Sequence, residues 1–158
     1  MTNYSKENIK KYALNYLNRY ASSKKNLKNI LWRKSKKFNN NEKEMKIHIK
    51  NILDELQKEN IINDERFANS IAFNYAQTGK SKKFITFKLL QKGINIDDIN
   101  NALQNLEEEN PDFEIQSAIN FARKKKLGKF GNSLNKKNDL SKMARAGFTY
   151  EIIKKVIY

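Results

Sequence analysis

Two stretches of the chain share one pattern of apolar positions around a glycine. When Gly93 is placed on Gly147, the apolar residues of 89–103 fall on apolar residues of 143–157. Those after the glycine recur at intervals of three and four, which predicts one buried helical stripe. Glycine ends a helix readily because it adopts the left-handed conformation at little cost. Each stretch is therefore predicted to be a helix, a glycine-terminated turn and a second helix.

A more distant copy of the same pattern lies upstream. Residues 24–37 and 47–56 carry the matching apolar positions, with Ser35 in place of the glycine and a polar insertion near 38–43. A further helical segment precedes each of the three copies. Repetition with this period is typical of stacked helical units, each too small to bury its own apolar face alone.

The sequence thus predicts an all-α fold, an elongated array of three tandem three-helix repeats with about nine helices. The repeats are expected at 1–60, 61–110 and 111–158. Five Gly and one Pro leave little material for the turns of a β-sandwich or barrel.

Several residues are predicted at helix ends. Gly93 and Gly147 are expected as C-caps, and Asp64 as a cap at the start of a helix. Asn110 before Pro111 is typical of an N-cap followed by the first helical position, so a helix is expected to begin there.

The charge of the chain indicates a polyanionic partner. It has 32 basic and 17 acidic residues, a formal net charge of +15, which is typical of proteins that bind nucleic acid or complexes containing it. A bias towards Lys, Asn and Ile, expected of an A+T-rich genome, accounts for part of this excess. The alternative for any single basic residue is that it lies on a solvated helical face and binds no partner. The candidate binding residues are Lys24, Lys25, Lys28, Arg33, Lys34, Lys36, Lys37, Arg123, Lys124, Lys125, Lys126, Lys129 and Arg145.

No catalytic or metal-binding group is predicted. His48 is the only histidine and the chain has no Cys, which removes the common zinc ligand sets. Asp97 and Asp98 begin the helix after Gly93, where carboxylates complement the N-terminal amides. The segment 128–133 lacks the Lys-Ser/Thr ending of a phosphate-binding loop. We therefore expect a protein that is not an enzyme and holds no cofactor or metal.

Aromatic residues at helical spacing beside aliphatic ones predict core packing. Trp32, next to a basic run, is the candidate for stacking on nucleobases. The aromatic residues predicted in the core are Tyr12, Tyr16, Tyr20, Phe67, Phe73, Tyr75, Phe84 and Phe87.

The chain has no stretch of 18 apolar residues and no apolar signal-peptide core. We therefore expect a cytoplasmic protein without a membrane partner. We also expect it to be a monomer.

Three segments together resemble the RecX family, the bacterial regulators of RecA recombinase. They are NIINDERFANSIAF, KFITFKLLQKGI and LSKMARAGFTYEII, in the order and spacing of that family. The chain departs from the pattern where Asn63 replaces the usual first Asp and Ala146 stands in place of an Arg.

The resemblance implies a modulator that lies along the groove of the RecA filament on DNA. It implies restraint of filament growth, ATP hydrolysis and strand exchange. DNA, single- or double-stranded, is the second expected partner, bound weakly or through the filament. The alternative is a general DNA-binding protein that coats single or double strands.

Overall fold

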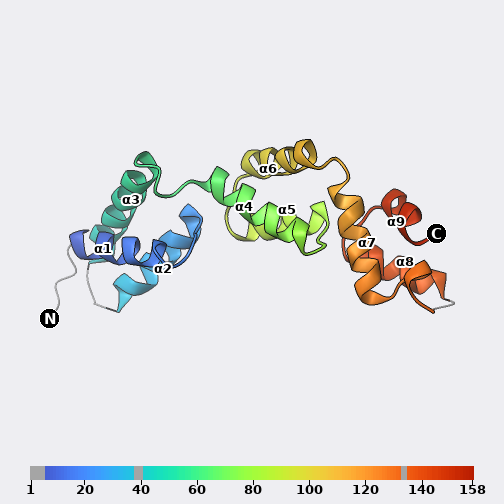
Figure 1. The fold of residues 1–158 in the computed structure, drawn as a ribbon. Helices are drawn as coiled ribbons and strands as arrows, with labels where there is room; N and C mark the ends of the chain where they lie inside the picture. The colour runs from blue at the N-terminus through green and yellow to red at the C-terminus, as the bar shows by residue number, and fades with distance from the viewer. Residues whose placement is uncertain (1–5, 38–40, 133–134) are drawn as a thin grey trace. The chain divides into compact units, whose positions relative to one another are not determined.

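The computed structural model describes residues 6–37, 41–132 and 135–158, and these ranges contain no strand. Their helices form three consecutive sets of three, so the predicted all-α repeat fold is confirmed (Figure 1). A short 3-10 helix, η1 (Gly128–Phe130), follows the seventh helix. The α-helices are α1 (Lys6–Leu17), α2 (Lys24–Lys36), α3 (Glu42–Lys58), α4 (Asp64–Gln77), α5 (Lys82–Gln91), α6 (Ile96–Glu109), α7 (Phe113–Lys125), α8 (Lys136–Arg145) and α9 (Tyr150–Ile157).

The chain divides into two compact units. The first comprises Met1–Phe67 and Lys92–Ile94, and the second comprises Ala68–Gln91 and Asn95–Tyr158. In the first unit α1, α2 and α3 pack on one another around an aliphatic core. In the second, α7, α8 and α9 enclose another core. The predicted boundaries at 60 and 110 remain a prediction. Of the predicted polar insertion, residues 38–40 lie outside the described ranges, and Asn41 accepts a hydrogen bond as the N-cap of α3.

Most of the apolar positions that the repeat alignment paired are buried alike, and Leu103, which is half-buried where Ile157 is buried, is the exception. Leu89 and Met143 are both fully buried, and so are Ile99 and Ile153, to within 1% of exposure. Burying one such aliphatic side chain stabilises the fold by about 1.5–3 kcal/mol. The three-to-four spacing therefore identified the inward stripe of the helices on either side of each glycine correctly.

The N-terminus of α2 is held by residues near the end of α5. Ser23, the N-cap, accepts a hydrogen bond from the Asn26 N–H at 3.2 Å and donates one to the Lys92 carbonyl at 2.6 Å. Gly93 has a φ of 78°, in the left-handed region predicted for it. A Cβ there would lie 2.6 Å from the Cβ of Lys25. Contact with α2 thus excludes a side chain at this position and explains why Lys92–Ile94 belongs to the first unit.

The same junction recurs between α5 and α8 in the second unit. Ser81 accepts a hydrogen bond from the Phe84 N–H at 3.1 Å and donates one to the Ala146 carbonyl at 2.8 Å. Gly147 has a φ of 98°. A Cβ there would meet the Ser81 hydroxyl and lie 3.2 Å from the Cβ of Lys83. The C-terminal glycine of one helix therefore faces the N-cap serine of another in both places.

A carboxylate completes each junction. Asp64 Oδ1 accepts a hydrogen bond from the backbone N–H of Lys24 at 2.8 Å, and Glu114 Oε1 accepts one from that of Lys82 at 3.2 Å. Each acid lies in the first turn of its own helix and satisfies an amide in the first turn of another.

Two predicted N-terminal assignments are wrong. Asp64 does not cap α4, because Asn63 accepts the hydrogen bond from the Arg66 N–H at 2.9 Å. Asn110 does not start the third set, because it is the C-cap of α6 and α7 begins at Phe113. The backbone N–H of Asn110 is committed to the Leu106 carbonyl at 2.9 Å, so α6 extends through the residues before the proline.

Candidate functional site

The basic cluster predicted on α2 divides between structural and exposed residues. Lys24 and Lys25 lie where Lys92–Ile94 packs against the start of α2. The backbone N–H of Lys24 donates a hydrogen bond to Asp64, and the Lys25 side chain packs against Gly93. Lys34 is half-buried with its ammonium 5.0 Å from the ring of Tyr12. Lys28, Arg33, Lys36 and Lys37, which make none of these contacts with the rest of the first unit, are exposed.

Part of the positive charge of the first unit is neutralised internally. Lys24 Nζ lies 3.1 Å from Asp54 Oδ1. Lys6 and Lys10 lie 3.1 and 3.2 Å from the Glu55 carboxylate. Hydrogen bonds from Lys6, and to a lesser extent from Lys10, hold the pKa of Glu55 below its usual range. Glu55 therefore stays charged at pH values at which an ordinary glutamate begins to take up a proton. A partner that binds these lysines of α1 and α2 must first break their internal ion pairs.

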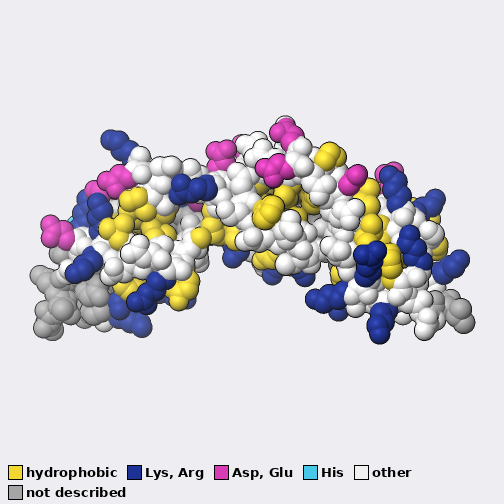
Figure 2. Space-filling view, viewed as in Figure 1, with side chains coloured by type: hydrophobic (Ala, Val, Ile, Leu, Met, Phe, Trp, Pro, Cys, Tyr) yellow, Lys and Arg dark blue, Asp and Glu magenta, His cyan; other side chains and the backbone are white. Residues whose placement is uncertain are grey.

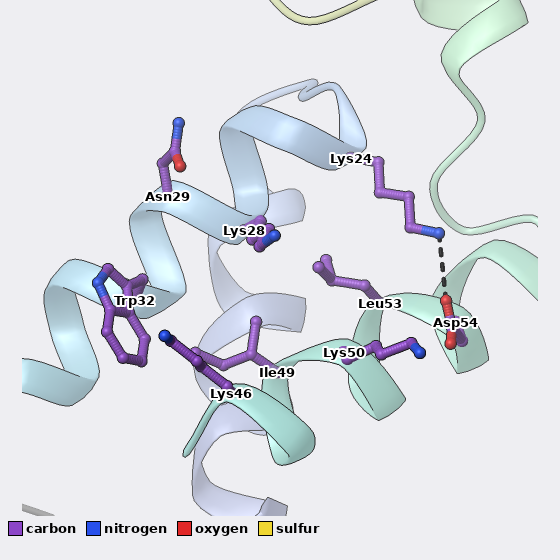
Figure 3. Close-up of a pocket in the computed structure, with 9 residues that line it drawn as sticks. All are labelled: Lys24, Lys28, Asn29, Trp32, Lys46, Ile49, Lys50, Leu53 and Asp54. Carbon is purple, nitrogen blue, oxygen red and sulfur yellow. Dashed lines mark hydrogen bonds and ion pairs between the residues drawn. The ribbon is translucent and has the colours of Figure 1, made fainter. Parts of the chain in front are cut away.

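A groove of about 560 Å³ runs between α2 and α3 (Figure 3). Trp32 stands on its α2 side, and Lys46 points towards the indole from α3. The ammonium groups of Lys36 and Lys46 lie 5.2 and 5.6 Å from the centre of the indole ring. Ile49 and Leu53 form the apolar part of the lining. Trp32 is therefore half-buried on one side and open to the groove on the other.

The second basic cluster lies where α7 ends. Arg123, Lys124, Lys125 and Lys129 are exposed there, and Figure 2 shows Lys and Arg side chains crowded over α7, α8 and α9. Arg123 and Lys129 both approach the ring of Phe130, at 5.3 and 5.5 Å from its centre. The cations are thus arranged around an aromatic ring, as on α2.

Lys126 ends α7 in the left-handed conformation, with a φ of 55°. The Leu127 N–H donates to the Ala122 carbonyl at 2.9 Å, which closes the helix end. This conformation turns the chain into η1, so Lys129 follows the basic end of α7 directly.

Asp139, which sequence reasoning did not single out, positions this loop. Its carboxylate is 2% exposed and accepts a hydrogen bond from the Gly128 N–H at 2.8 Å. The bond ties the start of η1 to α8. No sequence signal distinguished Asp139 from a first-turn acid, because the contact depends on how α8 packs beside η1.

Arg145 lies exposed at the C-terminal end of α8 and donates a hydrogen bond through Nε to the Ser141 carbonyl at 3.4 Å. It belongs to the second unit with the α7 cluster. The α2 cluster belongs to the first.

Two aromatic residues predicted in the core, Phe73 and Phe87, are 47% and 57% exposed. On α5 the inward stripe consists of Ile85 and Leu89, four positions apart, so Phe87 between them points outward. Leu90 is 49% exposed on the same helix. α5 therefore carries apolar side chains on both faces. Tyr20, also predicted in the core, is 57% exposed.

Sites for other chemistry are not found in the described ranges. His48 Nε2 lies 3.3 Å from Glu44 Oε1 one turn earlier on α3. Among the described residues no group of His, Asp or Glu is arranged to hold a metal ion. None of the helices in that part of the chain is long and apolar enough to cross a membrane.

Comparison with known proteins gives one consistent match. A family model for the second three-helix domain of RecX matches residues 63–103. The regulatory protein RecX of Myxococcus xanthus (strain DK1622) is 34% identical over 154 residues, which cover 92% of this chain and 81% of that protein.

Solved structures show a similar fold. The crystal structure of RecX from Lactobacillus salivarius gives a TM-score of 0.73 at 23% identity, covering 96% of this chain and 94% of that one. A second crystal structure, of a regulatory protein RecX, gives 0.73 at 19% identity, covering 96% and 70%.

Proposed function

This chain belongs to the RecX family, and from that premise we propose that it regulates the RecA recombinase without being an enzyme. It binds along the groove of the RecA–DNA filament and restrains filament extension, ATP hydrolysis and strand exchange. The observation that carries the proposal is the relationship to a regulatory protein RecX over 92% of the chain.

The two basic clusters support a polyanionic partner. One lies on α2 and the other at the end of α7, in different units. Each unit can therefore contact the filament separately, and two tethered contacts raise the overall affinity by effective concentration. The formal charge of +15 favours association with a DNA-containing complex.

The outward face of α5 supports a partner that is partly protein. Exposed Phe87 and Leu90 present apolar surface, which DNA phosphates do not bury but a protein groove does. Lys83 and Lys88 lie on the same helix, so the complementary surface is apolar with acidic groups.

The alternative is a protein that simply coats single- or double-stranded DNA, for which the basic clusters alone suffice. The two functions differ in what is bound best at physiological salt. A DNA-coating protein loses affinity steeply with salt, because each phosphate contact contributes about 0.9 to the log-log slope. Protein-protein contacts are screened less.

Binding to filament and to naked DNA can be compared directly. The chain has no Cys, so the variant Lys58→Cys has a single thiol, at an exposed position, to which a fluorescent dye can be attached. We expect fluorescence anisotropy to show tighter binding to preformed recombinase filaments than to the same DNA alone at about 0.15 M salt. Equal or tighter binding to naked DNA, with the steeper salt dependence, would favour the DNA-coating function.

A further inference from the structure

We propose that the groove between α2 and α3 is a binding site for single-stranded nucleic acid, in which a nucleobase stacks on Trp32 and the flanking phosphates pair with lysines. The site acts without the recombinase. Its failure would leave the proposed regulation standing, and failure of that regulation would leave this site standing.

The groove has the size and lining of a ligand site. Its volume of about 560 Å³ lies within the roughly 300–1,000 Å³ usual for such sites. Ile49 and Leu53 contribute apolar surface beside the indole. A flat aromatic or heterocyclic group fits there better than a compact ion.

Charge around the groove selects an anion. Among the described lining residues Asp54 is the one carboxylate, and Lys24 pairs with it at 3.1 Å. The remaining lining lysines, Lys28, Lys46 and Lys50, leave the groove with excess positive charge. All three are exposed, so they can move to meet phosphates.

Trp32 distinguishes a nucleotide from other anions. The ammonium groups of Lys36 and Lys46 lie over its ring, where they are attracted by the negative π-face. A base that stacks on the indole takes the place of an ammonium group, which is then close to the phosphate of the same nucleotide. An acidic peptide would use the lysines but would leave the ring face unused.

The groove is expected to bind single strands because a base must be unstacked before it can stack on Trp32. In a duplex each base already stacks on its neighbours, and exposing it costs unstacking and unpairing energy. In a single strand the bases are free to stack on a protein aromatic ring, and such stacking tolerates any base. The groove is therefore expected to prefer single strands with little sequence preference.

Trp32 is the only tryptophan of the chain, so its fluorescence reports this site alone. We expect a short oligothymidylate to quench the emission, because a stacked base quenches an indole. Two probes of the same charge serve as controls: an abasic oligonucleotide, which keeps the phosphates without bases, and a polyglutamate peptide. We expect neither to quench comparably.

Variants separate stacking from charge. We expect Trp32→Ala to weaken binding of dye-labelled oligothymidylate about tenfold, and Trp32→Phe to weaken it less. We expect Lys28→Ala with Lys50→Ala to lower the salt slope by about 0.7 per lost phosphate contact, while quenching at saturation remains. Circular dichroism checks that the variants fold. If Trp32→Ala does not fold, Trp32→Phe still tests the stacking contribution.

Three outcomes overturn the proposal. Oligothymidylate that binds without quenching Trp32 would place the nucleic-acid site elsewhere. Equal quenching by the abasic strand would mean that stacking is not involved, and equal quenching by polyglutamate would make an acidic peptide the occupant. Absence of binding by any of the three probes would show that the groove is not an anion site.

Discussion

Replacement of Gly147 by alanine is expected to destabilise the second unit by about 2–3 kcal/mol. The backbone φ of 98° strains any residue with a Cβ by about 1–2 kcal/mol. The added Cβ also meets the Ser81 hydroxyl, which holds its place through hydrogen bonds to Phe84 and Ala146. Moving that hydroxyl weakens a helix cap worth about 1 kcal/mol. Urea unfolding followed by circular dichroism measures the loss.

Gly79 provides the matched control for this substitution. It belongs to the same unit and has a φ of 80°, but a Cβ there would come no closer than 3.3 Å to any neighbour. Gly79→Ala should therefore cost the backbone strain of about 1–2 kcal/mol and a small shift of the Ser117 carbonyl, with no helix cap disturbed. If Gly147→Ala costs no more than Gly79→Ala, the junction between α5 and α8 does not constrain the glycine. In the double variant with Ser81→Ala, the combined loss should be less than the sum.

Removal of either exposed basic cluster is expected to weaken control of the recombinase by about tenfold. Three contacts of roughly 0.5 kcal/mol each sum to about 1.5 kcal/mol. The variants replace three residues by Ala, and the measurement is the concentration of this protein that gives half-maximal inhibition of the recombinase ATPase. Lys24 and Lys25 stay in place because they contact Asp64 and Gly93 within the first unit. The two triple variants change Arg33, Lys36 and Lys37, or Lys124, Lys125 and Lys126.

The matched control removes three exposed lysines outside both clusters, Lys11, Lys43 and Lys58. It lowers the net charge equally, so it should regulate almost as the parent does if position matters. Thermal stability should change little in all three variants, since exposed lysines contribute little to folding. If both cluster variants regulate like the parent, the clusters are a solvated face. If all three variants weaken regulation equally, net charge alone accounts for the effect.

The sequence predicted the inward faces of the helices but not the contacts between helix ends. Periodicity marks a stripe such as Ile85 and Leu89 because burial of one face is a local property of a helix. The left-handed glycines were also predictable, since a helix stop has a local signature. The N-cap serine that faces each glycine, Ser23 for Gly93 and Ser81 for Gly147, lies 70 and 66 positions away. No local rule relates residues at that separation.

The prediction for Asp64 failed for a similar reason. An acid at the start of a helix is locally indistinguishable from its cap, and only tertiary packing directs it to the N-terminus of α2. Ser35 illustrates the converse. It stands at the glycine position, yet α2 continues through Lys36 and Lys37 has an ordinary right-handed conformation. In the other two sets the start of another helix lies against the glycine.

The sequence predicted which residues form the basic clusters of the candidate site but not how they are arranged in space. Counting charges found both basic clusters, and the position of Trp32 beside one of them was visible in the sequence. The division of the α2 lysines between a junction and an exposed surface was not, because it depends on Asp54, Asp64 and Gly93 from other segments. The exposure of Phe87 was missed because an aromatic residue beside aliphatic ones resembles a core residue on either face of a helix.

The DNA-dependent ATPase activity of the cognate recombinase tests regulation most directly. The recombinase is assembled on single-stranded DNA, and the rate of ATP hydrolysis is measured with increasing amounts of this protein. Regulation through the filament predicts that the rate falls and stays low when the DNA concentration is doubled, because the inhibitor acts on the filament itself. An unchanged rate at saturating protein, or inhibition that excess DNA fully relieves, would contradict regulation through the filament.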